Sequence, residues 1–237
     1  NMLWATTSTF RSDTHSFSFS MFSNTKKCRG KKNAYGETSE NIEWLHISLN
    51  ELSKKSVIGT SSYRREFQIK KMRNDLDCKL IRGNVDTRIY KLKKGQYDAI
   101  ILSSAGIYSL NLDSEITQFF STSEMIPSAG QGIVALQCRQ EDEEMISLLK
   151  KVNHEPTHYC ALAERGVLKI LEGDCETAVG VYAQIYGKEI RLNAELFSID
   201  GSEKFYESKS KEIKFAKNLG EEIGEILRIK SNNSYKK

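Results

Sequence analysis

The feature that most constrains the fold is an alternation that begins at Ser56, where short apolar runs are separated by polar segments long enough to form helices. Runs and segments alternate over residues 57–58, 62–73, 78–81, 84–94 and 99–102. Strands that alternate with helices pair in parallel, because each helix returns the chain to the same end of the sheet. The pattern therefore predicts an α/β fold built on a β-α-β-α-β unit.

Arginines and hydroxyl side chains follow the ends of two of these predicted strands. After the first strand come Thr60, Ser62, Arg64 and Arg65, and after the second come Arg82 and Arg88. Strand carboxyl ends and helix N-termini share one edge of a parallel sheet, so these side chains are expected to face one cleft. Guanidinium groups bind carboxylates bidentately and stay charged. The pattern predicts a site for several carboxylates; the alternative is a solvated helix face with ion pairs to Glu66 or Asp86.

The rest of the chain predicts a small α+β unit after a connecting segment. Gly130-Gln131-Gly132 precedes a predicted strand at 133–136, and a helix is expected over 142–152. Pro156 opens a helix over 157–171 that Gly173 ends, because proline suits the first helical turn and glycine the residue after the last. Further strands and a final amphipathic helix are expected at 178–186, 190–198, about 203–210 and about 215–229.

The first forty residues are predicted to be loop or disorder. Eleven of the first twenty-five are serine or threonine, the basic stretch Lys26–Lys32 follows, and apolar periodicity is slight. A solvated insertion explains the basic stretch better than a nucleic-acid or membrane contact. The formal net charge of +4 is spread along the chain, which favours anionic small molecules over nucleic acid. No apolar stretch approaches the ~20 residues of a membrane span, so no membrane insertion is expected.

One cysteine differs from the others in its surroundings. The five cysteines include no C-x-x-C pair, which indicates neither a disulfide framework nor a zinc site and favours a reducing compartment. Cys78, Cys138 and Cys160 lie in apolar or helical runs, as buried structural cysteines do. Cys175 follows a glycine-containing turn, where a thiolate can reach an external electrophile.

His154, His158 and Cys160 together would suggest a metal cluster. Pro156 stands between the two histidines and disrupts their pairing across one helical turn. No metal site is therefore expected.

Six blocks of sequence stand in the order and spacing of one enzyme family. They are Gly59–Arg65, Arg82–Arg88, Tyr97–Gly106, Pro127–Gly132, Ala163–Arg165 and Leu171–Cys175. Over roughly residues 56–230 the chain resembles the hydroxymethylbilane synthase family, also called porphobilinogen deaminase. The resemblance implies a transferase that joins four porphobilinogen units head to tail into hydroxymethylbilane, with release of ammonia, in tetrapyrrole and haem biosynthesis.

The resemblance also implies an architecture. It is a hinged, periplasmic-binding-protein-like pair of domains, of which the first is incomplete, plus a small α+β C-terminal domain. A remnant of domain 1, domain 2 with the arginine-lined cleft, a return segment to domain 1 and the C-terminal domain would occupy residues 1–50, 51–126, 127–152 and 153–237. Met2-Leu3-Trp4 would be a core strand of domain 1, followed by an insertion at 5–40.

The family resemblance assigns roles to the candidate residues. Cys175 would bear a dipyrromethane cofactor through a thioether. The carboxylates of cofactor and substrate would be bound by Arg64, Arg65, Arg82, Arg88, Thr60 and Ser62, and the cleft would be lined by Ser103, Gly106 and Gln131. The usual Gly-Gly-Cys is here Gly173-Asp174-Cys175. Aspartate tolerates a left-handed turn, but its charge disfavours the neighbouring thiolate and is expected to slow cofactor attachment.

One part of the family pattern is not found in these residues. The Lys-Asp motif, whose aspartate stabilises the cationic intermediate at the pyrrole nitrogens, is absent from residues 1–237. Asp86 is better explained as a residue of the first helical turn. No catalytic carboxylate is therefore assigned, and this chain alone is expected to be inactive. Because it begins at Asn1, a fragment or a processed product is expected.

A soluble monomer in the cytoplasm or a plastid is expected, with the small molecule porphobilinogen as its substrate and neither nucleic acid nor membrane as a partner. Two other classes stay open. The first is a non-catalytic anion-binding module of the same hinged fold, which would have no use for the thiol of Cys175. The second is a nucleic-acid-binding protein, whose affinity would fall steeply with salt.

Overall fold

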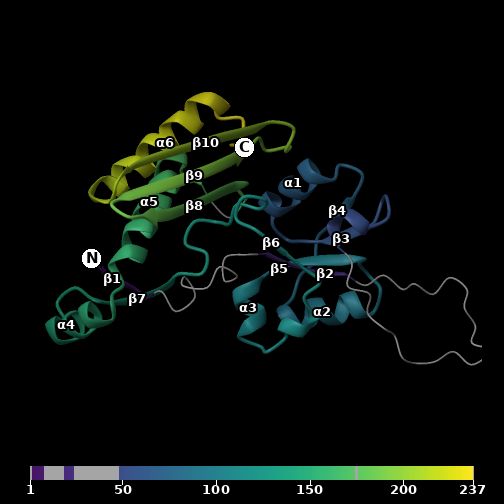
Figure 1. Cartoon of the computed structure of the whole chain (residues 1–237), viewed down its shortest axis with the longest axis horizontal. Helices are drawn as coiled ribbons and strands as arrows, with labels where there is room; N and C mark the ends of the chain where they lie inside the picture. The colour runs from purple at the N-terminus through teal and green to yellow at the C-terminus, as the bar shows by residue number, and fades with distance from the viewer. Residues whose placement is uncertain (1, 8–18, 24–47, 174–175, 237) are drawn as a thin grey trace, which may run out of the picture. The chain divides into compact units, whose positions relative to one another are not determined.

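The computed structural model describes residues 2–7, 19–23, 48–173 and 176–236. Its helices and strands confirm the α/β class, and the chain divides into two compact units (Figure 1). The mixed-sheet unit comprises Phe19–Ser61 and Gln68–Phe120. The C-terminal unit comprises Asn1–Ser18, Ser62–Phe67 and Ser121–Lys237.

The mixed-sheet unit is built on five strands in the order β4-β3-β5-β2-β6. Their bounds are Phe19–Ser23 for β2, Val57–Gly59 for β3, Asp77–Lys79 for β4, Ala99–Ser103 for β5 and Gln118–Phe120 for β6. β3 pairs in parallel with β4 and with β5, as the β-α-β-α-β pattern predicts. β2 pairs antiparallel with β5 and with β6, which makes the sheet mixed.

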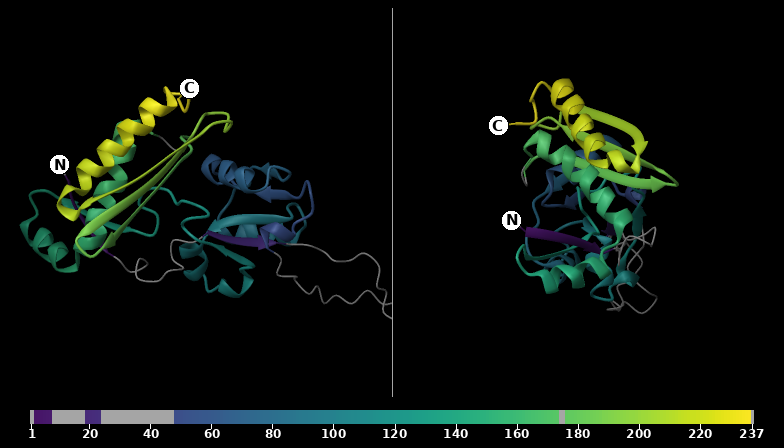
Figure 2. Two further views of the ribbon diagram at one scale, coloured as in Figure 1. Left: turned by 45° about the horizontal axis from the view of Figure 1, so that its top comes forward. Right: turned by 90° about the vertical axis from the view of Figure 1, so that its left-hand side faces the viewer.

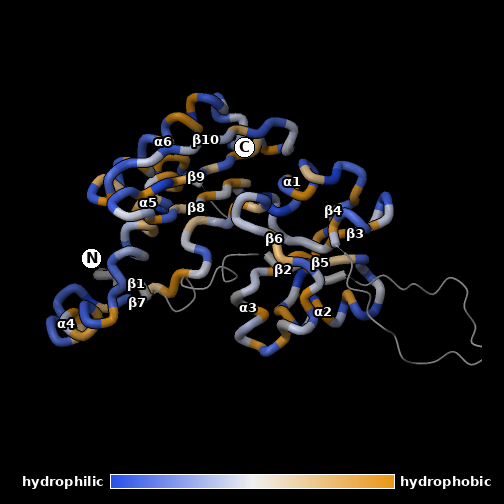
Figure 3. The backbone as a smooth tube through the Cα atoms, in the orientation of Figure 1, coloured by the Kyte–Doolittle hydropathy of each residue, from blue (hydrophilic) through white to orange (hydrophobic). Residues whose placement is uncertain are grey.

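The helical elements that accompany this sheet hold its core in place. They are η1 Leu49–Glu51, α1 Tyr63–Met72 from Gln68 onward, α2 Val85–Lys93, α3 Ser104–Tyr108 and η2 Asp113–Glu115. Ala99–Leu102 of β5 are all buried, and this apolar run can be followed in Figure 3. A strand buried on both faces has a continuous apolar run instead of an alternating one. Its neighbours in the core are Ile81, Ile89, Leu92, Ile107 and Ile116.

The prediction of loop or disorder for the first forty residues is wrong for β2. Phe19–Ser23 fills the edge of β5 that β3 does not use, with Phe19 opposite Ser103 and Ser23 opposite Ala99. The sequence does not indicate this strand, because it is only five residues long and lies in a serine-rich stretch. Its partner strand β5 also lies far along the chain.

β1, Met2–Thr7, pairs antiparallel with β7, Val134–Arg139. This pairing confirms the strand expected at Met2-Leu3-Trp4, but the strand continues through Thr7, so the loop predicted there is wrong. The remaining positions of the expected insertion, including Cys28 and the basic stretch Lys26–Lys32, lie outside the described residues.

The C-terminal unit contains a three-stranded antiparallel sheet in the order β10-β9-β8, with two helices on one of its faces (Figure 2). The elements are α5 Glu155–Leu171, β8 Val179–Tyr186, β9 Glu189–Phe197, β10 Lys204–Glu212, η3 Ile213–Phe215 and α6 Ala216–Ser231. All the helices and strands predicted for this region are present. Across the described residues, no helix combines the length and the apolar character that crossing a membrane requires.

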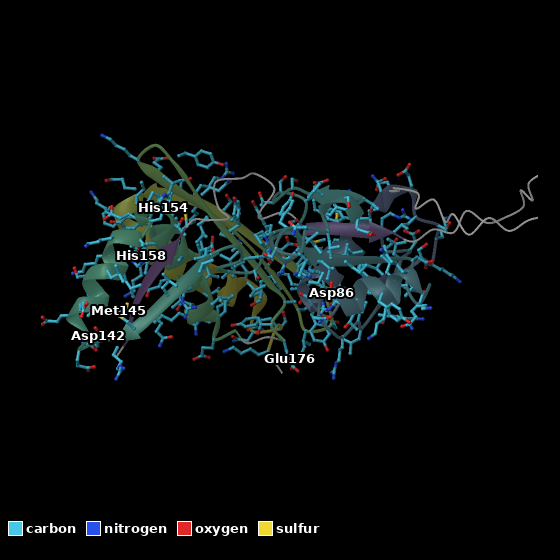
Figure 4. The ribbon with its side chains drawn as sticks, turned by 90° about the horizontal axis from the view of Figure 1, so that it is seen from below. Asp86, Asp142, Met145, His154, His158 and Glu176 are labelled. Carbon is cyan, nitrogen blue, oxygen red and sulfur yellow. The ribbon has the colours of Figure 1, made fainter. Side chains whose placement is uncertain are left out.

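α4, Glu143–Val152, follows β7 and begins where the sequence predicts. Asp142 is its N-cap, and the Asp142 carboxylate accepts a hydrogen bond of 3.0 Å from the backbone N–H of Met145 (Figure 4). This side chain satisfies one of the amide groups that a helix leaves unpaired at its start.

α5 and α6 cross at glycines. A Cβ atom on Gly220 would lie 2.0 Å from the carbonyl oxygen of Ala163, and one on Gly166 would lie 3.0 Å from Cα of Gly220. The two backbones therefore approach more closely than side chains ordinarily permit. The core between the helices and the sheet includes Ala163, Val167, Leu171, Leu219, Ile223 and Leu227.

Candidate functional site

The carboxyl ends of β3 and β4 lie side by side, as the sequence predicts. The backbone N–H of Thr60 donates to the carbonyl of Lys79 at 3.0 Å, and that of Ile81 donates to the carbonyl of Thr60 at 3.4 Å. Arg82 follows directly, and Thr60 is buried. Because β3 and β4 are paired in this register, Thr60 and Arg82 lie at the same edge of the sheet.

A tight turn leads from Arg82 into α2. Gly83 has a φ of 122°, and a Cβ atom there would lie 2.7 Å from Cγ2 of Thr87, so glycine suits this position. Asn84 is the N-cap: its Oδ1 accepts from the N–H of Thr87 at 2.9 Å and from the Thr87 hydroxyl at 2.6 Å. Asp86 lies in the first turn, where the positive end of the helix dipole stabilises a carboxylate. The prediction of Asp86 as a helix-start residue is confirmed.

Three cationic side chains gather at this helix start. Arg88 donates from Nε to the carbonyl of Gly83 at 2.7 Å, and Lys91 donates from Nζ to the carbonyl of Arg82 at 2.8 Å. Arg82 is exposed and Arg88 half-buried. Within the described residues, neither arginine forms an ion pair with Asp86, and the Nη groups of Arg88 and the Arg82 guanidinium bond to no side chain or carbonyl. The guanidinium groups of Arg82 and Arg88 therefore have N–H donors that can bind a ligand.

Arg64 and Arg65 lie on the first turn of α1, in the part of the chain that belongs to the C-terminal unit. Only 6% of Arg64 is exposed, and its Nη1 donates to the carbonyl of Ile126 at 2.7 Å. Burial lowers the pKa of Arg64 to about 9, with repulsion from Arg65 adding to the effect and Glu195 opposing it. The backbone N–H of Arg65 donates to the hydroxyl of Ser62 at 3.4 Å, so Ser62 helps to begin the helix.

Three further residues were expected to line a cleft. Ser103 ends β5, and Gly106 lies in α3, where a Cβ atom would be 3.7 Å from Val85. Gln131 belongs to the C-terminal unit, in a turn between two glycines with φ of 75° and 74°. The side-chain Nε2 of Gln131 is buried and bonds to no other described residue.

A buried carboxylate that sequence reasoning did not assign holds this turn. Glu164 is 2% exposed, and its two oxygens accept from the N–H of Gly130 at 2.7 Å and the N–H of Ala183 at 2.9 Å. Nearby, the N–H of Val181 donates to the carbonyl of Pro127 at 2.8 Å. An acidic residue among the buried positions of α5 was the available signal, because buried carboxylates are held by hydrogen bonds.

Cys175 lies outside the described residues, but its flanks are described. α5 ends at Leu171, and the residue that takes the left-handed conformation is Glu172, with a φ of 52°. The predicted end of the helix at residue 171 is confirmed, but the left-handed residue that follows it is Glu172 and not Gly173. The N–H groups of Glu172 and Gly173 both point to the carbonyl of Leu168, as in a helix-ending motif. The chain resumes at Glu176, labelled in Figure 4.

Three other cysteines and two histidines lie in the described part of the chain. Cys160 is buried, and Cys78 and Cys138 are half-buried. His154 precedes α5, and its Nδ1 lies 2.8 Å from the hydroxyl of Thr157 (Figure 4). The part of the chain that the structure describes holds no group of three or more side chains placed to bind a metal ion.

Two models of known protein families match this chain. The model of the porphobilinogen deaminase dipyrromethane cofactor binding domain matches residues 40–147, which include all four arginines. The model of the porphobilinogen deaminase C-terminal domain matches residues 158–228, which include Cys175. Both models describe one enzyme, which polymerises porphobilinogen into hydroxymethylbilane in tetrapyrrole biosynthesis. With matches to two of its domains over most of the sequence, the chain belongs to the porphobilinogen deaminase family.

Proposed function

We propose that Cys175 is the attachment point of the dipyrromethane cofactor in this transferase. The cofactor and the substrate porphobilinogen are those of the family. The observation that carries the assignment is the placing of the cysteines: Cys160 is buried in a helix, whereas Cys175 stands between the end of α5 and the start of β8. A non-catalytic anion-binding module is not favoured, because the chain matches a domain named for the cofactor.

The attachment chemistry needs a thiolate. Loss of ammonia from the aminomethyl group of a pyrrole leaves an electrophilic methylene carbon. Sγ of Cys175 would form the new S–C bond at that carbon, and the thiol proton would leave with the ammonia. Chain growth repeats the same C–N cleavage, with the free α-carbon of the terminal pyrrole as nucleophile in place of sulfur.

The arginine-rich segments would bind the acetate and propionate groups of cofactor and substrate. Arg82 and Arg88 carry this proposal furthest, since their guanidinium donors lie at the start of α2 beside Lys91. Thr60 and Ser62 would complete the set at the end of β3 and the start of α1. Arg64 and Arg65, on the first turn of α1, would add their guanidinium groups to the set. Ser103, Gly106 and Gln131 would line the same cleft.

The proposed architecture is a hinged pair of periplasmic-binding-protein-like domains with a small C-terminal domain. Domain 2 at 51–126 and the C-terminal domain at 153–237 would be joined to domain 1 through residues 1–50 and 127–152. The pairing of β1 with β7 supports the link between the two proposed parts of domain 1, whereas β2 pairs with strands of the proposed domain 2. We expect a monomer in the cytoplasm or a plastid that binds neither nucleic acid nor membrane.

Replacing Cys175 by serine should abolish cofactor attachment. The hydroxyl of serine is far less nucleophilic than a thiolate at neutral pH, so no covalent pyrrole should form. Intact mass spectrometry of protein produced with the family's N-terminal segment should show two pyrrole units on the wild type and none on the C175S variant. The Cys138→Ser variant is the matched control and should keep the added mass. An unmodified wild-type mass, or the same added mass on C175S, would contradict the assignment.

Residues 1–237 alone should convert porphobilinogen very slowly or not at all. The cationic intermediate requires a carboxylate aimed at the pyrrole nitrogens, and no residue in this sequence matches the family's aspartate. Uroporphyrin fluorescence after acid oxidation measures the product, with and without the family's N-terminal segment. Equal rates in the two forms would mean that another carboxylate carries catalysis, and Asp86 would be the first to replace.

A further inference from the structure

We infer that the three-stranded sheet of the C-terminal unit carries, on the face away from its helices, a binding site for a small aromatic carboxylate. The site is centred on Arg191 and Asn193, which lie in the middle strand β9. It shares no residue with the segments proposed to bind cofactor and substrate, and the inference does not depend on them.

The two faces of this sheet differ in character. Leu192 and Ala194 of β9 lie in the core that α5 and α6 cover. Successive residues of a strand point to opposite faces, so the side chains that alternate with these two lie on the other face, which is called the open face below. The strand register places its polar members in three rows: Gln184 beside Arg191, Asn193 beside Ser208, and Glu195 beside Tyr206.

A pocket of about 340 Å³ lies on the open face, and every residue that lines it belongs to the C-terminal unit. The segment that contains Ile126 borders it. The side chain of Ile126 packs against Tyr182, and a Cβ atom on Gly180 would lie 2.9 Å from the carbonyl oxygen of Ile126. Thr122 and Ser123 of the same segment also line the pocket. The pocket therefore has paired strands as its floor and this segment as a wall.

Hydrogen bonds within the floor leave N–H donors for a ligand. Oδ1 of Asn193 accepts from the hydroxyls of Tyr206 at 3.2 Å and Ser208 at 2.7 Å, so the Nδ2 group of Asn193 is left. Arg191 donates from Nε to the hydroxyl of Ser208 at 3.3 Å, so its two Nη groups are left. Among the residues that the structure describes, these Nδ2 and Nη groups have no partner. A donor-rich floor favours a ligand that accepts hydrogen bonds.

Two tyrosine rings stand on the strands that flank β9. Tyr186 on β8 is 59% exposed and Tyr206 on β10 is 47% exposed. The hydroxyl of Tyr186 donates to Oε1 of Gln184 at 2.8 Å, as that of Tyr206 does to Asn193. Rings tied through their hydroxyls offer flat apolar surfaces at a small cost in conformational entropy, and they suit an aromatic ligand.

The charges of the pocket select an anion. Nζ of Lys204 lies 3.0 Å from Oε1 of Glu195, a residue only 4% exposed, so this carboxylate offsets the charge of Lys204. The charge of Arg191 has no such partner in the described part of the chain. A planar guanidinium binds a planar carboxylate through two parallel hydrogen bonds. One carboxylate on an aromatic ring therefore matches the donors, the charge and the rings.

Benzoate is the probe, added to the chain of residues 1–237. Two-dimensional NMR follows the backbone amides of β8, β9 and β10, which should shift in a saturable way with a dissociation constant of ~1 mM or below. Benzamide keeps the ring and loses the charge, whereas acetate and inorganic phosphate keep a charge and lose the ring. Each of these three should bind about tenfold more weakly than benzoate or less tightly still.

Three variants locate the binding. Arg191→Gln removes the charge, and Asn193→Asp replaces the Nδ2 donor by an oxygen while an oxygen still accepts from Tyr206 and Ser208. Both should weaken benzoate binding by about tenfold or more, the scale of losing a charge-assisted hydrogen bond. Lys217→Gln is the control, because it removes one positive charge from an exposed position on α6, on the other side of the sheet. It should match the wild type, and melting temperature checks the folding of all three.

The site is overturned if benzoate gives no saturable shift, or if R191Q and N193D bind it as tightly as K217Q does. Benzamide binding as tight as that of benzoate would overturn the carboxylate, and equally tight binding of acetate or phosphate would overturn the aromatic class. The measurement uses neither porphobilinogen nor the cofactor. A negative result would therefore leave the proposed transferase function as it stands.

Discussion

Replacing Arg82 or Arg88 by leucine should lower turnover of porphobilinogen by two orders of magnitude or more. Both guanidinium groups have donors free of described protein partners at the start of α2. Losing a charged, bidentate contact to a ligand in a shielded site costs ~2–5 kcal/mol. The leucine variants should keep their fold, because Asn84 still caps α2 and Ile89 and Leu92 still fill the core.

The measurement is kcat/KM in the form of the protein that converts porphobilinogen, together with dipyrromethane occupancy by intact mass. Lys94→Leu is the control: it removes a positive charge from the other end of α2, where Lys94 lies 5.4 Å from the centroid of the Tyr90 ring. Arg88→Lys keeps the charge but not the planar fork, so it should lose most of the activity that the leucine variant loses. Activities of R82L and R88L that match K94L would exclude the carboxylate-binding role.

Replacing Gly220 by alanine should destabilise the C-terminal unit by several kcal/mol. The new Cβ would lie 2.0 Å from the carbonyl oxygen of Ala163, a backbone atom that no rotamer change can move. Overpacking costs ~1–3 kcal/mol when side chains can adjust, and more when backbones must separate. The gain of ~1 kcal/mol in helix propensity is too small to offset this.

Urea unfolding followed by circular dichroism measures the effect. Asn218→Ala, at an exposed position on α6, is the control and should be neutral or slightly stabilising. A G220A variant as stable as N218A would mean that α5 and α6 can move apart without loss, and that their close crossing contributes little to stability.

Elements with a strong local signal were predictable from the sequence. The apolar run of β5 and the helical spacing of α5 reflect how each segment is buried, and that information lies within the segment. β2 was missed because its strand character comes from pairing with β5 and β6, which a serine-rich stretch of five residues does not reveal. A strand formed by distant partners is the kind that local pattern describes least well.

The same distinction separates the candidate site residues. Arg82 follows a strand and Arg88 lies on the next helix, so the rule that strand ends share an edge places them correctly. The burial of Arg64 depends on the carbonyl of Ile126, and the role of Glu164 depends on Gly130 and Ala183. These partners are remote in sequence, so only the folded chain identifies them. The helical spacing of Arg64 and Gln68, both buried, was a weak local sign.

The two hydrogen bonds of Glu164 join a connecting turn to the core of the C-terminal unit. One carboxylate joins a glycine turn that precedes α5 to a strand that follows it, so both bonds are made only when α5 and β8 are in place. Closing such a loop costs entropy before the bonds repay it. We therefore expect the turn with Gln131 to unfold together with the core, although it lies in a connecting segment.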